Sequence, residues 1–192
     1  MGTKRADSLV LEQRPHLVEG GGSIPTSALQ LRFVEVTMRK ACELNAQWHS
    51  MLPRTDLGNM LAGGRSIAFA TVYDGCYYAV AIFSQPIIRS IASDRGVIEL
   101  RRLAIADNAP KNTASRMMAV CLRLVKRAYP QTHRCVSYLA VDVHSGTIYR
   151  ASGWRPVGKI VAARPQRKKG DKQRATGPLQ TTSRKQRWEI EL

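Results

Sequence analysis

Alternating apolar and polar residues predict several β-strands, two of which form a hairpin. The segment 29–36 (LQLRFVEV) alternates between the two classes, as a half-buried strand does. The runs SIAFATVY and CYYAVAIF flank Asp74-Gly75, and an Asp-Gly pair between β-rich runs is a strong hairpin signal. We therefore expect antiparallel strands at 67–73 and 77–83. Further strands are expected at 97–105, 135–141 and 155–160.

Helical spacing marks three segments between these strands. Residues 37–50 (TMRKACELNAQWHS) come closest to it in the first part of the chain. A second helix can be capped by Thr113 or Ser115 and ends at Tyr129-Pro130. A short third helix is expected in GTIYRASGW, with Gly153 just past its end. Strands and helices in this order indicate a mixed α/β domain.

Composition divides the chain into three parts. Residues 1–24 are polar and end near a run of three glycines, which indicates a flexible segment. The domain is expected at 25–161, since 192 residues with 44% apolar content suffice for one core. Residues 162–192 are basic and poor in apolar residues, so we expect a disordered tail, whose final WEIEL adds an edge strand, packs back on the core or has no role. Because neither a secretory signal nor an apolar run of about 18–20 residues is visible, we expect a cytoplasmic protein with no membrane partner.

The balance of charge points to polyanionic partners. The chain has 30 Lys and Arg against 14 Asp and Glu, a formal net charge of +16. Such an excess favours nucleic acid or a phosphorylated cofactor, although many basic surfaces bind neither specifically. The tail residues expected to contact DNA phosphates are Arg167, Lys168, Lys169, Lys172, Arg174, Arg184, Lys185 and Arg187. The alternative is that the tail only increases solubility.

The stretch LRRLAIADNAPKNTASR predicts a strand, a polar turn and a helix in direct succession. The N–H groups at a helix N-terminus attract phosphate, although most turns of this kind bind nothing. This turn has no glycine, so its side chains must contribute more than its backbone. The candidate phosphate ligands, with two residues of the preceding strand, are Leu103, Ile105, Asn108, Lys111, Asn112, Thr113, Ser115 and Arg116.

Several of these segments together resemble a known family. ELRRLAIADNAPKNTASRMM, VSY and GTIYRASGW, with a looser match at WHSMLP and YYAVAIF, resemble the Mom-like DNA-modification proteins of bacteriophages, a branch of the Gcn5-related N-acyltransferase (GNAT) superfamily. The resemblance implies a mixed, mostly antiparallel central sheet flanked by helices. It also implies acetyl-CoA or a related acyl-CoA, held at the turn described above. The implied acceptor is the exocyclic amine of adenine in DNA, inside an infected or lysogenic bacterium, with protection from restriction as the result.

Four residues are catalytic candidates. His49, at a helix end, is suited to act as a general base or metal ligand, or is only a polar end residue. Tyr149 matches the position where the fold places a tyrosine that protonates the leaving thiolate; alternatively, its ring packs in the core. Asp142 is the nearest carboxylate to the family's acidic position, which Ala140 occupies here. Tyr78 points to the opposite strand face from its neighbour, and one of the two is free to contact a base.

Two other kinds of function remain open. The chain is an N-acyltransferase for a small amine or a protein, or a DNA-binding module that keeps only the fold. His49, Asp142 and His144 could together form a small polar cluster in the folded protein. Metal binding by this cluster is a weaker hypothesis than a role without metal. The four cysteines are scattered without a CxxC pair, so we assign no metal-binding residues.

Overall fold

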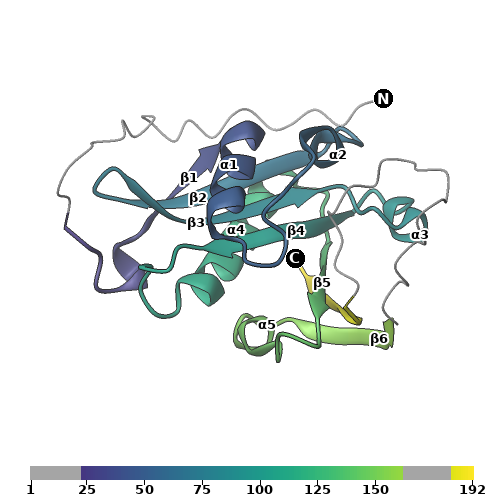
Figure 1. Ribbon diagram of the computed structural model, residues 1–192. Coiled ribbons are helices and arrows are strands. Elements are labelled where there is room, and N and C mark those ends of the chain that lie inside the picture. The colour runs from purple at the N-terminus through teal and green to yellow at the C-terminus, as the bar shows by residue number, and fades with distance from the viewer. Residues whose placement is uncertain (1–22, 162–182) are drawn as a thin grey trace, which may run out of the picture.

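The computed structural model describes residues 23–161 and 183–192. Its centre is a seven-stranded sheet in the order β1-β2-β3-β4-β5-β7-β6 (Figure 1). The strands are β1 (Arg32–Val36), β2 (Ser66–Tyr73), β3 (Cys76–Ser84), β4 (Val97–Ile105), β5 (Arg134–Ala140), β6 (Arg155–Val161) and β7 (Lys185–Glu191). Every neighbouring pair is antiparallel except β4 and β5, which are parallel. The predicted mixed, mostly antiparallel sheet is confirmed.

The predicted hairpin is β2–β3, and its turn has the backbone geometry that Asp-Gly favours. Asp74 and Gly75 both have positive φ, 46° and 76°. Glycine adopts such angles without steric cost and aspartate tolerates them, so this dipeptide sets the register of the two strands. β2 and β3 are buried along almost their whole length, because helices cover both faces of the sheet.

Two helices cover opposite faces of the sheet (Figure 1). α1 (Met38–Trp48) packs its Ala41 and Leu44 against one face, where Ala68, Val80 and Ile82 complete a core. α4 (Thr113–Ala128) covers the other face with an apolar stripe that includes Met117, Cys121 and Val125. The remaining short helices are η1 (Ala28–Gln30), α2 (Leu57–Leu61), α3 (Arg89–Ala92) and α5 (Thr147–Ala151). Within the described ranges, no helix is long and apolar enough to cross a membrane.

The segment Lys185–Glu191 forms strand β7, which agrees with the alternative in which the end of the chain adds a strand, although β7 is not an edge strand. β7 lies between β5 and β6 and pairs with both. Trp188 is only 3% exposed and, with Ile190, joins the core on the α4 face. Arg187, Glu189 and Glu191 alternate with them, so an amphipathic strand lies within a segment that is basic on average. Residues 1–22 and 162–182, with the phosphate contacts predicted for Arg167–Arg174, lie outside the described part of the chain.

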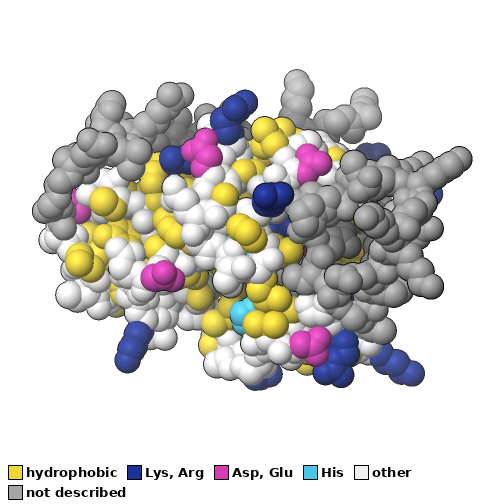
Figure 2. Space-filling view, viewed as in Figure 1, with side chains coloured by type: hydrophobic (Ala, Val, Ile, Leu, Met, Phe, Trp, Pro, Cys, Tyr) yellow, Lys and Arg dark blue, Asp and Glu magenta, His cyan; other side chains and the backbone are white. Residues whose placement is uncertain are grey.

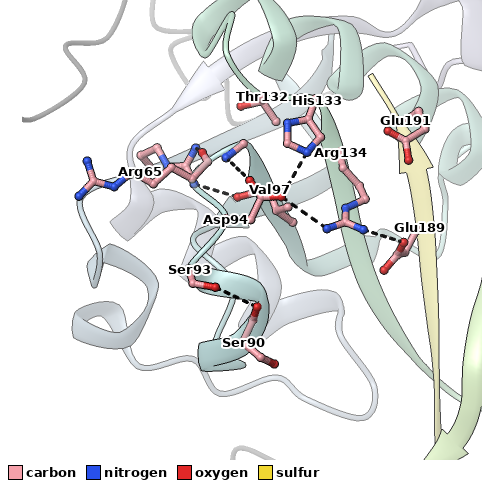
Figure 3. Close-up of polar contacts among 12 residues, drawn as sticks. Arg65, Ser90, Ser93, Asp94, Val97, Thr132, His133, Arg134, Glu189 and Glu191 are labelled. Carbon is pink, nitrogen blue, oxygen red and sulfur yellow. Dashed lines mark hydrogen bonds and ion pairs between the residues drawn. The ribbon is translucent and has the colours of Figure 1, made fainter.

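The parallel β4–β5 ladder begins at Val97 and Arg134, the first residues of the two strands. Ion pairs connect the elements at this end of the ladder (Figure 3). Asp94 contacts the His133 Nε2 atom at 3.2 Å and an Arg134 nitrogen at 3.6 Å. Arg134 continues to Glu189 on β7 at 3.4 Å. Nearby, the buried Arg65 guanidinium donates to the Val97 carbonyl at 2.8 Å and to the Arg95 carbonyl. This end of the strand pair is therefore closed by side chains from several elements.

Candidate active site

At their other ends, β4 and β5 separate and enclose a cavity. Their parallel pairing stops at Leu100↔Ser137, although β4 continues to Ile105 and β5 to Ala140. β3 remains paired with β4 up to Ile105, and β7 remains paired with β5 up to Ala140. Each strand thus follows its outer neighbour, and Figure 1 shows β5 turning away from β4. The resulting cavity of about 890 Å³ is within the range of cofactor sites.

The cavity reaches several elements besides the two strands. The segment after α1, helix α2 and the loop after β3 contribute His49, Met60 and Ile87. The α4 N-terminus contributes Ala114, and the segment 144–149 contributes His144 and Tyr149. Figure 2 shows apolar side chains gathered around a histidine on this face. Candidate residues that are far apart in the sequence therefore share one cavity wall.

Ser137 stands where the two strands separate. Its hydroxyl donates to the Leu100 carbonyl at 3.0 Å and lies 2.8 Å from the Tyr149 hydroxyl. Tyr149 is 6% exposed, stacks on Trp188 at 5.1 Å and meets Trp154 edge-on at 5.4 Å. Burial raises the pKa of Tyr149 to about 12, so the phenol stays protonated near neutral pH. The structure thus brings Tyr149 to the cavity with its hydroxyl already paired and its ring packed in the core.

Glu99 is a buried carboxylate in the cavity wall. Its Oε2 accepts the Ile87 N–H at 3.1 Å, and its Oε1 lies 3.4 Å from the Arg101 Nε atom. Burial raises the pKa of Glu99, while the charge of Arg101 opposes the shift. A carboxylate whose pKa is raised is a stronger base than an exposed one, which makes Glu99 a chemically distinctive residue of the site.

Two consecutive arginines reach this wall because of an irregularity in the β3–β4 ladder. Ile82 pairs with Arg102 and Phe83 with Leu100, so Arg101 is an extra residue on β4. Arg101 donates to the Ser84 hydroxyl at 3.0 Å. Burial lowers the pKa of Arg102 to about 10, aided by the charge of Arg101, which leaves Arg102 charged at neutral pH. Two positive charges therefore lie beside the cavity.

Two buried hydrogen-bond donors of the wall have no partner among the described residues. They are the Nε atom of Arg102 and the hydroxyl of Tyr138. Burial, followed by the charge of Glu99, raises the pKa of Tyr138 to about 12, so its hydroxyl also stays protonated. Buried polar atoms in native proteins are usually paired, so two unpaired donors on residues of the cavity wall are unusual. Both atoms are shielded by neighbouring atoms, so a ligand with acceptor atoms reaches them only if side chains of the wall shift.

His49 is neutral at pH 7 and has a defined tautomer. It ends α1, and its Nδ1 atom accepts the Leu52 N–H at 3.2 Å. Because a backbone N–H can only donate, the proton of the neutral imidazole is on Nε2. Burial, then the charges of Arg102 and His144, lower the pKa of His49 to about 4. His49 therefore presents an N–H donor and is a poor general base. In the described ranges, no three His, Cys, Asp or Glu side chains are placed to hold a metal ion.

Two predicted catalytic residues lie outside the cavity wall. Asp142 is exposed, and its carboxylate accepts from the backbone N–H and the Nε of Arg184, each at 2.8 Å. These bonds lower the pKa of Asp142, so it is held as an ion-pair partner away from the wall. Tyr78 is 4% exposed near the β2–β3 turn, where burial raises its pKa. Spacing along the chain could not reveal either environment.

The predicted phosphate turn is present, but several of its side chains have structural roles. The Thr113 hydroxyl donates to the Pro110 carbonyl at 2.7 Å, and the Ser115 hydroxyl to the Asn112 carbonyl at 3.1 Å. Arg116 donates to the carbonyls of two residues near η1 and lies over the Phe33 ring at 5.0 Å. Of the predicted ligands, Leu103 and Ile105 line the cavity, while Asn108, Lys111 and Asn112 are exposed. The first-turn N–H groups of Ala114 and Ser115 have no intrahelical acceptor, so the backbone is better suited than these side chains to bind an anion.

The predicted phosphate-binding residues in and just before β7 have partners within the fold. Arg184 binds Asp142, and Arg187 lies 3.0 Å from Glu189. Lys185 lines the cavity. Contacts from Arg184 and Arg187 to DNA phosphates stay a prediction, and in the fold both charges are partly balanced by neighbouring carboxylates.

Sequence reasoning missed five residues of the wall, Glu99, Arg101, Arg102, Ser137 and Tyr138. One signal was available, since ELRR places three charged residues within a strand that is otherwise apolar. Strand periodicity alone directs two consecutive arginines to opposite faces, and only the irregularity at Arg101 changes this.

Comparisons with known proteins agree with this architecture. A Bacillus subtilis acetyltransferase solved with CoA matches with a TM-score of 0.57 at 12% identity, over 84% of this chain and 99% of that one. A ribosomal-protein-alanine N-acetyltransferase from Brucella melitensis gives 0.59 at 12% identity, over 84% and 100%. A spermidine N-acetyltransferase from Vibrio cholerae, solved with CoA and spermine, gives 0.57 at 12% identity, over 85% and 96%.

The fold is therefore that of the GNAT acetyltransferases. Within this class the chain belongs to the Mom protein family, whose sequence model matches residues 71–191. That span runs from the end of β2 through β7 and includes both strands that enclose the cavity. No curated protein matches the sequence.

Proposed function

We propose that this protein is an acyl-CoA-dependent transferase that modifies the exocyclic amine of adenine in DNA. The cavity between the separated strands β4 and β5 carries the proposal, because it contains unpaired donors and an adjacent helix N-terminus. Membership of the Mom family and the CoA-containing structures of the same fold support it. The net charge of +16 supports a polyanionic acceptor.

The cavity residues fit an acyl-CoA. Beyond Leu100 and Ser137, the facing backbone groups of β4 and β5 no longer bond each other, so an extended amide chain can pair with them. Leu103, Ile105 and Leu139 supply apolar contacts. The N-terminus of α4 is suited to a pyrophosphate, since N–H groups and the helix dipole both favour anions. The cofactor would supply an activated acyl group.

The residues of the wall can move the protons that the reaction requires. An adenine amine must lose a proton when it forms an amide bond, and Glu99 is a buried base with a raised pKa. His49 can donate its Nε2–H to a developing oxyanion, because its Nδ1 is occupied by Leu52. Tyr138 and Tyr149 both remain protonated. Because the Ser137 hydroxyl donates to Leu100, the Tyr149 hydroxyl donates to Ser137 and must leave that bond before it can protonate a leaving thiolate. These roles replace Asp142 as a candidate base and redefine His49 as a donor.

The position of the basic segment also supports DNA as the acceptor. Val161 pairs with Lys185 at the boundary of the segment 162–182, and Ser183 and Lys185 line the cavity. The two ends of this segment, which has six Lys and Arg and one Asp, therefore lie beside the cavity. Contacts from Arg167, Lys168, Lys169, Lys172 and Arg174 to phosphates would bind DNA without reading its sequence.

Nucleoside mass spectrometry of DNA from expressing cells tests the proposal. We expect an adenosine of increased mass with the unaltered protein and a loss of at least 100-fold with Glu99→Gln, which still offers an acceptor to the Ile87 N–H. The matched control is Glu43→Gln, on the exposed side of α1, which should keep the modification. Unchanged nucleosides in cells that contain abundant folded protein would overturn the proposal.

A further inference from the structure

The loop between β3 and α3 exposes two adjacent isoleucines at the cavity. Ile87 is 59% exposed and Ile88 is 44% exposed, and both contribute to the cavity wall. We name this pair the apolar tip. Neighbouring large apolar side chains that remain exposed beside a cavity are typical of an interaction surface.

The apolar tip is held firmly. Glu99 on the cavity wall accepts the Ile87 N–H at 3.1 Å. The Ile88 carbonyl accepts two N–H groups of α3, at 2.9 and 2.8 Å, and so begins that helix. The Gln85 N–H donates to the Arg65 carbonyl at 3.0 Å, and Pro86 is buried. A backbone bonded on both sides keeps the two isoleucines exposed rather than letting them collapse onto the core.

Cations flank the apolar tip. The exposed Arg89 follows it directly, and the exposed Arg95 lies further along the same connection between β3 and β4. Across the cavity, Ile148 lines the wall near Val143, and both are partly exposed apolar residues. Apolar side chains between exposed cations match the inner stack and outer phosphates of a nucleic-acid duplex.

We propose that Ile87 and Ile88 insert into the base stack of duplex DNA and occupy the space left by the adenine that enters the cavity. This inference depends on the proposed function, since an enzyme acting on a duplex base must first take it out of the stack. Apolar side chains inserted at base steps are a known means of opening the stack. Arg89 binds a phosphate next to the opened step. The bond from Glu99 to Ile87 ties the apolar tip to the wall on which the adenine is modified.

The test compares native and heat-denatured samples of one plasmid as substrates, with purified full-length protein and acetyl-CoA. Mass spectrometry of the nucleosides measures adenine modification in both samples. The variant is Ile87→Ala/Ile88→Ala, the conservative version is Ile87→Leu/Ile88→Leu, and the control is Ile24→Ala, whose isoleucine is 67% exposed outside the cavity wall. Circular dichroism melting verifies that each variant is folded.

We expect the alanine variant to lower the ratio of native to denatured modification at least tenfold, because a base in denatured DNA need not be taken out of a duplex. The leucine variant and Ile24→Ala should keep that ratio within about twofold. An equal loss on both substrates, or no loss, would overturn the inference while leaving the proposed function intact. If the unaltered protein modifies neither substrate, both the proposed function and this inference fail.

Discussion

The two ends of the β4–β5 pair show opposite uses of polar residues. Where the parallel ladder begins, ion pairs link the loop residues Asp94 and His133 to Arg134 on β5 and Glu189 on β7 (Figure 3). Where the strands separate, the Arg102 Nε atom and the Tyr138 hydroxyl are buried without a partner in the described part of the chain. At the first end, ion pairs join the strands, although the Arg134 Nε atom and the Thr132 hydroxyl also lack a partner in the described part of the chain. At the second end, the residues with unpaired groups line a cavity.

β7 connects the two ends, so its core residue should have the largest effect of any single change. Trp188 stacks on Tyr149, and its ring lies where a side chain at Gly146 would be. Trp188→Ala should lower the free energy of unfolding by about 3–5 kcal/mol. Urea denaturation measures this loss. Trp188→Phe should lose clearly less, and full stability of the alanine variant would show that β7 is not part of the domain.

A substitution at the end where the parallel β4–β5 ladder begins should lower the stability of the fold without changing ligand binding. Arg134→Ala removes the link from Asp94 to Glu189, whose side chain is only 8% exposed, and should cost about 1–3 kcal/mol. CoA affinity should stay within about twofold in a calorimetric titration. The control is Arg123→Ala on the exposed side of α4, which should leave both quantities unchanged. A variant that loses CoA binding at full stability would contradict the division between the two ends.

A substitution where β4 and β5 separate should lower activity and leave the stability of the fold nearly unchanged. Tyr138→Phe removes a hydroxyl that bonds nothing described in the fold, so the free energy of unfolding should change by less than about 1 kcal/mol. Adenine modification should fall about tenfold or more, because the hydroxyl is available to a ligand. Tyr77→Phe, on the strand β3 and outside the cavity wall, serves as the control. If Tyr138→Phe destabilises the fold strongly, the hydroxyl has a structural role.

The smallest effect concerns the pH dependence of stability. The pKa of His49 falls from 6.5 to about 4 on folding, so between these values the unfolded chain binds more protons. His49 therefore makes stability fall as the pH decreases through this window, and it has no such effect above pH 6.5. Melting temperatures of His49→Gln should decline less steeply from pH 6.5 to 4.5 than those of the unaltered protein. Parallel declines would contradict the buried, neutral His49.

Local patterns predicted the regular elements well, since they depend on near neighbours in the sequence. Asp74-Gly75 set the β2–β3 hairpin, and apolar spacing marked α4. For β7, an edge strand at WEIEL was only one of the alternatives, and neither its full length nor its place inside the sheet was predicted, because its alternation is short and follows a long basic segment. Its partners, β5 and β6, lie 20 or more residues earlier in the chain, where composition gives no information.

The site was less predictable because its chemistry depends on long-range contacts. Asp142 looked catalytic from its position alone, yet Arg184, 42 residues away, binds its carboxylate. Glu99 looked like an ordinary strand residue, yet its burial and its bonds to Ile87 and Arg101 set it apart from the other carboxylates of the described chain. A sequence lists the reactive groups, but the pairing of one group with another decides which of them remain free.

The central claim is that acyl-CoA binds where β4 and β5 separate, and a titration of CoA tests it most directly. Ala140 lines the cavity at the end of β5, so Ala140→Trp should fill the space with little effect on the core. Ala46→Trp, at an exposed position of α1, is the matched control. We predict that the unaltered protein and the control bind one CoA, and that Ala140→Trp binds at least tenfold more weakly at an unchanged melting temperature. Equal affinity for all three proteins would contradict the account.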